Sequence, residues 1–139
     1  MHRRMRIRSV SFLIISLSWL LLLPCGNTAD KPRVIEITAD KDAKFKIAGQ
    51  KEPVLTLKAN EVVVLRITAR KGPEWSKDGA VHSFTVKPLK DLGWDLRLKE
   101  GTQDFPLVAP EQPGEYLAEC LVLCGPQHED MRLKVVVTP

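Results

Sequence analysis

Residues 120–131 read CLVLCGPQHEDM, and no other stretch of this sequence says as much about the fold and its chemistry. The stretch spaces two cysteines, a histidine and a methionine as Cys-x3-Cys-x3-His-x2-Met, at a point where a predicted strand runs into a turn. In an extended strand, Cys120 and Cys124 would lie ~13 Å apart, at ~3.3 Å per residue. Gly125 and Pro126 do not suit a central strand, so we expect the chain to curl here and bring the two sulfurs together.

The donor atoms of this stretch form a metal-binding set. Thiolate, imidazole and thioether donors together favour soft or borderline metals, copper above all. Zinc sites more often use cysteine and histidine alone, and magnesium or calcium would need oxygen ligands. The remaining imidazole, His82, lies on a predicted strand far upstream, and a β-sandwich can bring such a residue beside the loop that joins its last two strands. After residue 29 the sequence contains no other cysteine, histidine or methionine than His82, Cys120, Cys124, His128 and Met131.

Short β-type runs recur along the rest of the chain and are separated by turns that contain glycine or proline. We predict strands at residues 34–37, 43–47, 54–58, 61–69, 81–86, 103–108, 115–121 and 132–138. Residues 89–98 are predicted to hold a short helix, which Gly93 weakens. No stretch after residue 29 has a long apolar face with helical periodicity. The pattern therefore predicts a single all-β domain, either a sandwich or a barrel.

The N-terminal segment differs in character from the rest. Four arginines within residues 3–8 precede the apolar run Val10–Leu23, which is shorter than the ~18 apolar residues expected of a membrane-spanning helix. We interpret residues 1–29 as an export signal, with a retained membrane anchor as the alternative, and residues 30–139 as the domain. Cys25 follows the apolar run where a lipidated cysteine would lie, but Pro24 precedes it where a lipidation signal has a small residue, so lipidation is poorly supported. The expected location is the periplasm or the outer face of the cytoplasmic membrane.

The charge balance argues against one class of partner. The chain has 21 basic and 17 acidic residues and a formal net charge of +4. Four of the basic residues are the arginines of residues 3–8, and all of the acidic residues follow residue 29, so residues 30–139 are formally neutral. A neutral domain gives no support for nucleic-acid binding.

The same motifs resemble a known family. The stretch 120–131, Val-His-Ser-Phe at 81–84 and Pro-Gly-Glu-Tyr at 113–116 are similar to the CuA domain of cytochrome c oxidase subunit II. This domain is a cupredoxin, a β-sandwich with Greek-key connections. The likeness covers most of residues 33–138 and implies electron transfer by a pair of copper ions.

The resemblance implies a role for each donor. Cys120 and Cys124 would bridge two copper ions, and His82 and His128 would each complete one of them. Met131 would be a weak ligand of one copper. A c-type cytochrome would be the expected electron donor and an oxidase subunit I-like chain the expected acceptor, with the protein acting as a subunit of an oxidase or as an independent relay. The chain alone would not be a catalyst.

Val122 lies midway between the two cysteines, where the resemblance makes its backbone carbonyl a weak ligand of the second copper. Subunit II commonly has glutamate at this position, and the glutamate side chain helps to hold magnesium against the catalytic subunit. A valine side chain has no oxygen, so we expect no magnesium ligand here.

Other interpretations of the same residues predict other functions. Cys120 and Cys124 could form a structural disulfide in an oxidising compartment, which would leave His128 and Met131 without a role. A copper chaperone would hold one Cu(I) ion and exchange it readily. A mononuclear blue-copper carrier would use His82, one cysteine, His128 and Met131. A hydrolase is disfavoured, because no Ser-His-Asp pattern is evident and Cys-His catalysis would not explain Met131.

Overall fold

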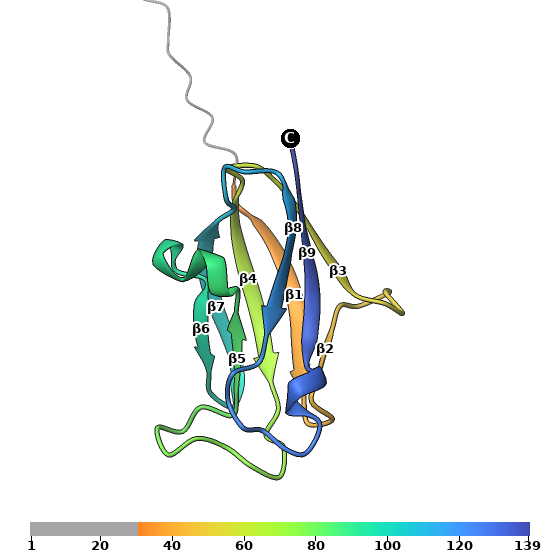
Figure 1. The fold of residues 1–139 in the computed structure, drawn as a ribbon, viewed down its shortest axis with the longest axis vertical. Coiled ribbons are helices and arrows are strands. Elements are labelled where there is room, and N and C mark those ends of the chain that lie inside the picture. Colours follow the sequence, from red (N-terminus) through yellow and green to blue (C-terminus); the bar gives the residue numbers. More distant parts are fainter. Residues whose placement is uncertain (1–30) are drawn as a thin grey trace, which may run out of the picture.

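The computed structural model describes residues 31–139, which form a sandwich of two β-sheets (Figure 1). One sheet has the strand order β2-β1-β4-β7 and the other β3-β9-β8-β5-β6. The strands are β1 (Arg33–Asp40), β2 (Lys44–Lys46), β3 (Val54–Lys58), β4 (Val62–Ala69), β5 (His82–Thr85), β6 (Asp95–Leu98), β7 (Gly101–Val108), β8 (Gly114–Glu119) and β9 (Arg132–Thr138). Two short 3-10 helices are η1 (Lys87–Leu92) and η2 (His128–Asp130). The predicted all-β sandwich is confirmed.

The predictions for the N-terminal segment fall outside the described residues. They concern the export signal or anchor in residues 1–29 and lipidation at Cys25. Between residues 31 and 139, no helix has the length and apolar character needed to cross a membrane.

The chain passes repeatedly between the two sheets, so strands that are distant in sequence become neighbours. β1 pairs in parallel with β4, and β3 pairs in parallel with β9, whereas the hairpin-connected strands β8 and β9 are antiparallel. Such connections are typical of Greek-key sandwiches. In β4, Val63, Leu65 and Ile67 are buried while Val62 and Arg66 are exposed. This alternation is the period of two expected for a strand with one face against a core.

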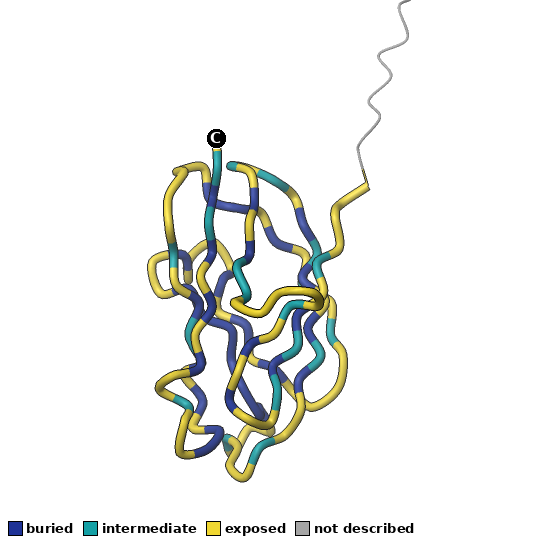
Figure 2. The backbone as a smooth tube through the Cα atoms, turned by 90° about the vertical axis from the view of Figure 1, so that its right-hand side faces the viewer, coloured by how far each residue is buried: buried dark blue, intermediate teal, exposed yellow. Residues whose placement is uncertain are grey.

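Apolar side chains from both sheets fill the space between them, and the buried segments line the inside of the sandwich (Figure 2). Phe45 of β2 and Phe84 of β5 join the sheets edge to face, with ring centroids 5.2 Å apart. Trp94 is fully buried, and its indole N–H donates to the carbonyl of Val108 at 3.0 Å. A buried tryptophan with its polar atom satisfied is a packing residue, and its replacement by alanine would cost about 3–5 kcal/mol.

The helix predicted over residues 89–98 is wrong in extent. The structure has the 3-10 helix η1 (Lys87–Leu92) followed by strand β6 (Asp95–Leu98). Gly93 ends the helix in the left-handed conformation, with φ 89°, and its N–H bonds back to the last turn. The strand reads Asp-Leu-Arg-Leu with both leucines buried and both charged residues exposed. This short alternation was the strand signal that the sequence contained.

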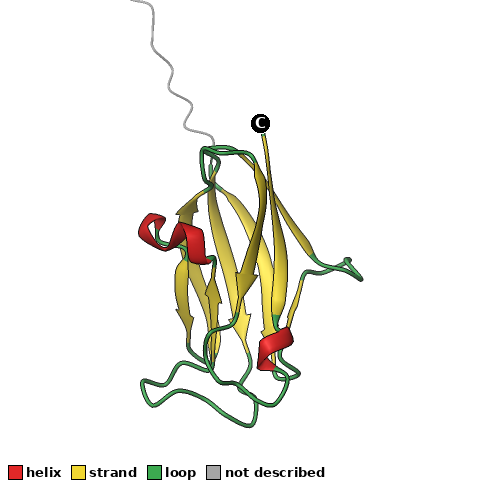
Figure 3. Cartoon of the chain, viewed as in Figure 1, coloured by secondary structure: helices red, strands yellow, loops and turns green. Residues whose placement is uncertain are grey.

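Two loops meet at one end of the sandwich (Figure 3). The metal loop, residues 120–131, joins β8 to β9, and the capping loop, residues 70–81, joins β4 to β5. Both lie at the lower end in Figures 1 and 3, whereas the C-terminus lies at the upper end. The predicted donors on β5 and in the metal loop therefore share one end of the molecule.

Candidate metal centre

The metal loop begins directly where strand β8 ends and folds back on itself. The backbone N–H of Cys120 donates to the carbonyl of Met131 at 3.1 Å, which closes the loop at its base. Gly125 has φ 146°, a value that favours glycine, and allows the chain to turn after Cys124. The two cysteine sulfurs lie 3.8 Å apart and are not joined by a disulfide. The predicted curl is thus found in the structure.

His82 is the first residue of β5 and is completely buried. Its Nε2 donates to the carbonyl oxygen of Arg70 at 2.8 Å. Because a carbonyl can only accept, the proton lies on Nε2, and Nδ1 keeps its lone pair. Nδ1 is 4.0 Å from the sulfur of Cys120. The ligand atoms of His82, Cys120 and Cys124 all lie within 4.8 Å of one another, as the predicted convergence requires.

Two further predicted donors reach the same place. The sulfur of Met131, a completely buried residue, lies 3.9 Å from the sulfur of Cys124. The carbonyl oxygen of Val122 lies 3.3 Å from the sulfur of Cys120. Each of these weak donors is therefore paired with a different cysteine.

His128 occupies a different position from the other donors. It begins η2 and is not among the residues whose ligand atoms lie within 4.8 Å of one another. Its Nδ1 is nevertheless buried and has no hydrogen-bond partner. A buried nitrogen without a partner costs about 1–3 kcal/mol. A metal ion would satisfy this nitrogen, so the nitrogen remains available as a ligand atom.

Ser83 supports the site, although sequence reasoning missed it. Its backbone N–H lies 3.4 Å from the sulfur of Cys120, and its hydroxyl accepts from the N–H of Leu121 at 2.7 Å. β5 and β8 pair in their ladder only at Thr85 and Glu119, so Ser83 supplies the connection beyond that point. The available signal was a small hydroxyl residue directly beside a predicted ligand in a short strand.

The two thiols are electrostatically unlike. A hydrogen bond from Cys124, together with the N–H of Ser83, lowers the pKa of Cys120 to about 4. The same contact, together with burial, raises the pKa of Cys124. The contact between the two sulfurs therefore favours the thiolate at Cys120 and the thiol at Cys124. Metal binding would release the remaining proton, because thiolates are the ligating form.

Two exposed leucines alternate with buried donors in the metal loop. Leu121 and Leu123 are 44% and 56% exposed, and the residues between and beside them, Cys120, Val122 and Cys124, are at most 4% exposed. Each exposed leucine therefore lies directly beside a buried cysteine in the chain. The two cysteines are thus shielded from water, while their leucine neighbours in the chain reach the surface.

No protein-family model matches the chain, and no curated protein matches it in sequence. The periplasmic domain of cytochrome oxidase subunit II (CoxB) of Bradyrhizobium japonicum has a TM-score of 0.55 at 13% identity, over 76% of this chain and 83% of that one. A chain of a heme-copper terminal oxidase dimer has a TM-score of 0.53 at 17% identity, over 76% of this chain and 65% of that one. Auracyanin B has a TM-score of 0.51 at 20% identity, over 79% of this chain and 92% of that one.

At these identities the comparisons show the fold, which is a cupredoxin-like β-sandwich. The resemblance to subunit II predicted from the metal-loop motif is confirmed at this level. Independently, the donor set of His82, Cys120 and Cys124 together with the thioether of Met131 fits copper better than zinc or an oxygen-seeking metal.

Proposed function

We propose that residues 30–139 form an extracytoplasmic CuA-type domain, which binds two copper ions and carries single electrons between protein partners. The convergence of one imidazole, two thiolates and a thioether in a buried site supports this proposal most strongly. A zinc site would not need the thioether, and a mononuclear blue-copper site would need only one of the thiolates.

The proposal assigns all five side chains. Cys120 and Cys124 bridge the two copper ions, and His82 and His128 each complete one of them. Met131 is a weak ligand of one copper. The unpartnered buried Nδ1 of His128 supports its assignment, because this nitrogen has no other role among the described residues.

Val122 completes the set through its backbone carbonyl, as a weak ligand of the other copper. The carbonyl oxygen lies beside the sulfur of Cys120, which supports this assignment. Its side chain offers no magnesium ligand, so any contact with a catalytic subunit is made without a metal at this position.

The bound copper pair would supply a one-electron redox couple. The part of the chain is to hold the donors in nearly the same positions in both redox states. The Arg70 carbonyl fixes the ring of His82, and the Ser83 hydroxyl fixes the start of the metal loop. Burial keeps water away from both cysteines. These features favour fast electron transfer, because little has to rearrange when the charge changes.

The proposed partners follow from the fold and the surface. A c-type cytochrome donor and an oxidase subunit I-like acceptor are proposed because two solved structures with this fold come from oxidases. The apolar surface at Leu121 and Leu123 offers a short path from a partner to the thiolates. With residues 1–29 as an export signal or anchor, the domain would lie in the periplasm or on the outer face of the cytoplasmic membrane. The chain would carry electrons and would not catalyse a reaction alone.

One observation favours a second candidate. The ligand atoms of His82, Cys120 and Cys124 already form a compact group without His128, and such a group could hold a single Cu(I) ion. A copper chaperone or storage protein would have this property. It would bind one copper with labile exchange and would lack an intense visible colour.

The deciding experiment is copper stoichiometry combined with electron paramagnetic resonance on protein that comprises residues 30–139. The CuA proposal predicts two copper ions per chain and one unpaired electron shared equally by both nuclei. One copper per chain without a signal would support the chaperone. One copper with an unpaired electron confined to a single nucleus would support a mononuclear blue site. Either result would refute the CuA proposal.

A further inference from the structure

The capping loop contacts both parts of the metal centre within a few residues. The carbonyl of Arg70 accepts the hydrogen bond from His82, which comes from β5. Two residues further along, Gly72 lies against the carbonyl of Cys124, which comes from the metal loop. The next residue, Pro73, lies against Gly125. Residues 70–73 thus join the two segments that supply the donors.

Gly72 lies in a gap that has no room for a side chain. A Cβ atom at this position would be 2.5 Å from the carbonyl oxygen of Cys124 and 3.3 Å from the carbonyl oxygen of Lys41. Both neighbours are backbone atoms, so neither can move away by rotating a side chain. Any other residue at position 72 would force the capping loop and the Cys124 backbone apart, since the contact is far closer than atoms tolerate.

The capping loop is held on its outer side as well. Arg97 of β6 forms an ion pair with Asp78 at 2.7 Å and a hydrogen bond to the Ser76 hydroxyl at 3.1 Å. The ammonium group of Lys71 lies 3.3 Å from the ring centroid of Trp75, a cation–π contact. These contacts fold the loop onto itself and onto β6. The loop is therefore a shaped part of the sandwich end rather than a loose connection.

We propose that the capping loop is a clamp on the metal centre, and that Gly72 is its positioning residue. The missing side chain at Gly72 lets the loop backbone pack directly on Cys124, which holds the second sulfur beside the first. This inference builds on the proposed copper site but concerns the packing of the apo protein, so it can be tested without metal. The proposal adds a residue that binds nothing itself and sets the geometry of one that does.

The test measures how readily the two thiols react in the metal-free protein. The full-length chain with Cys25→Ser is used, so that only Cys120 and Cys124 can react with a chromogenic aromatic disulfide. We expect Gly72→Ala to raise the reaction rate about tenfold or more, because buried thiols react through local opening of the structure. A rate equal to that of the parent protein would overturn the clamp.

Gly79→Ala is the matched control. Gly79 lies in the same loop, and an added Cβ would meet nothing within 4 Å, although its φ of 83° makes alanine strained there. Strain in the loop without a clash at Cys124 is expected to change the thiol rate by less than about twofold. If Gly79→Ala matched Gly72→Ala, general loosening of the loop would explain both, and the specific role of Gly72 would be refuted.

Two further measurements keep the result interpretable. Thermal unfolding shows whether Gly72→Ala still folds cooperatively. If it does not, Pro73→Ala replaces it, because this change removes the packing on Gly125 without adding a clash. Pro73→Ala is expected to raise the thiol rate about threefold. A rate equal to that of the parent protein would overturn the clamp.

In copper-loaded protein, Gly72→Ala should also alter the copper hyperfine splitting, whereas Gly79→Ala should not. Failure of the parent protein to bind copper would refute the proposed function and leave the thiol rates as a valid test of the clamp.

Discussion

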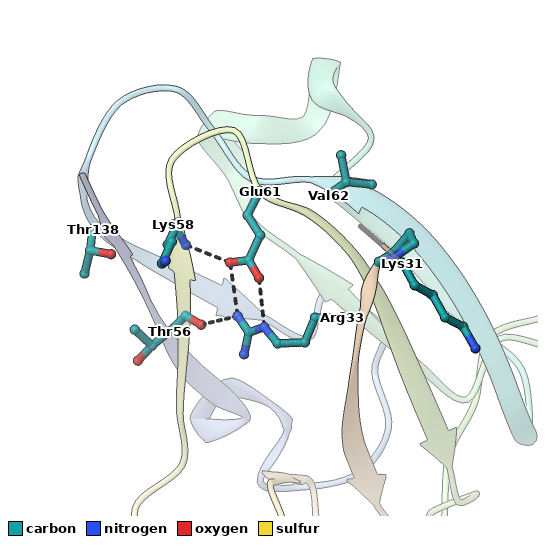
Figure 4. A pocket seen from close by; sticks show the side chains of 8 residues that line it. Lys31, Arg33, Thr56, Lys58, Glu61, Val62 and Thr138 are labelled. Carbon is teal, nitrogen blue, oxygen red and sulfur yellow. Dashed lines mark hydrogen bonds and ion pairs between the residues drawn. The ribbon is translucent and has the colours of Figure 1, made fainter. Parts of the chain in front are cut away.

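At the end of the sandwich opposite the metal loop, polar groups satisfy one another (Figure 4). The guanidinium of Arg33 bonds to both carboxylate oxygens of Glu61, at 2.8 and 3.1 Å, and to the carbonyl of Thr56 at 2.9 Å. Glu61 also accepts from the backbone N–H of Lys58 at 2.8 Å. At the metal end, the buried polar nitrogen of His128 has no partner. The polar groups at the Arg33–Glu61 end satisfy one another, whereas the metal end has a buried nitrogen without a hydrogen-bond partner.

The sizes of the hollows at the two ends would suggest that a ligand binds at the end opposite the metal loop. The hollow lined by Arg33 and Glu61 measures about 810 Å³, whereas the hollow beside Cys124 measures about 280 Å³. Volume alone would therefore place a ligand at the wrong end. The chemistry of each end decides instead of its volume. The paired charges of Arg33 and Glu61 have little to offer a ligand, while the buried donors His82, Cys120 and Cys124 form a cluster that favours a metal. The proposed function therefore belongs to the metal end, although its hollow is the smaller one.

The largest effect that separates the two ends is expected from Cys120→Ser. Removal of one bridging thiolate should reduce copper from two ions per chain to one or none and abolish the shared-electron signal, because a serine hydroxyl is a poor bridging ligand for copper. Metal analysis and electron paramagnetic resonance measure both quantities. Retention of an intense blue colour with one copper would instead indicate a mononuclear site that uses Cys124.

Much of the metal end was predictable because its donors are close in sequence. The short spacing of Cys120, Cys124, His128 and Met131 places them in one loop, and Gly125 favours a turn there. The remaining site features depend on segments that meet only in three dimensions.

Three features of the structure could not be predicted in this way. The contact of Gly72 with Cys124 joins loops from different strand pairs, and no local pattern signals it. The support from Ser83 depends on how β5 and β8 diverge beyond Thr85. Strand β6 was missed because its four residues follow a 3-10 helix closely, with only Gly93 and Trp94 between the two elements.

A smaller effect at the metal end is expected from Met131→Leu. The two side chains have similar volumes, so the free energy of unfolding should fall by less than about 1.5 kcal/mol despite complete burial. Both copper ions should be retained. The reduction potential should rise, because loss of a weak donor destabilises the oxidised state. A redox titration followed by absorbance measures the shift. Loss of one copper would show that Met131 is a required ligand and not a weak one.

The smallest effect is expected at the opposite end, from Glu61→Gln. Glutamine can still accept from the Lys58 N–H but loses its charge opposite Arg33, whose side chain is 52% exposed. Exposed ion pairs contribute about 0–1 kcal/mol, so we expect a loss of stability in that range at pH 7. Copper binding and its spectrum should not change.

The pH dependence of that loss follows from the same pair. The guanidinium of Arg33 holds the pKa of Glu61 below its usual value. A carboxyl group with a lowered pKa stabilises the fold above its unfolded pKa, and this contribution disappears as the pH falls through its folded pKa. The difference between Glu61→Gln and the parent protein in urea unfolding should therefore shrink as the pH falls from 7 to about 3. A constant difference would mean that a pH-independent effect of the substitution, and not the charge of Glu61, causes the loss of stability. In either case unchanged copper content would keep the two ends functionally distinct, whereas altered copper content would show that they are coupled through the sandwich.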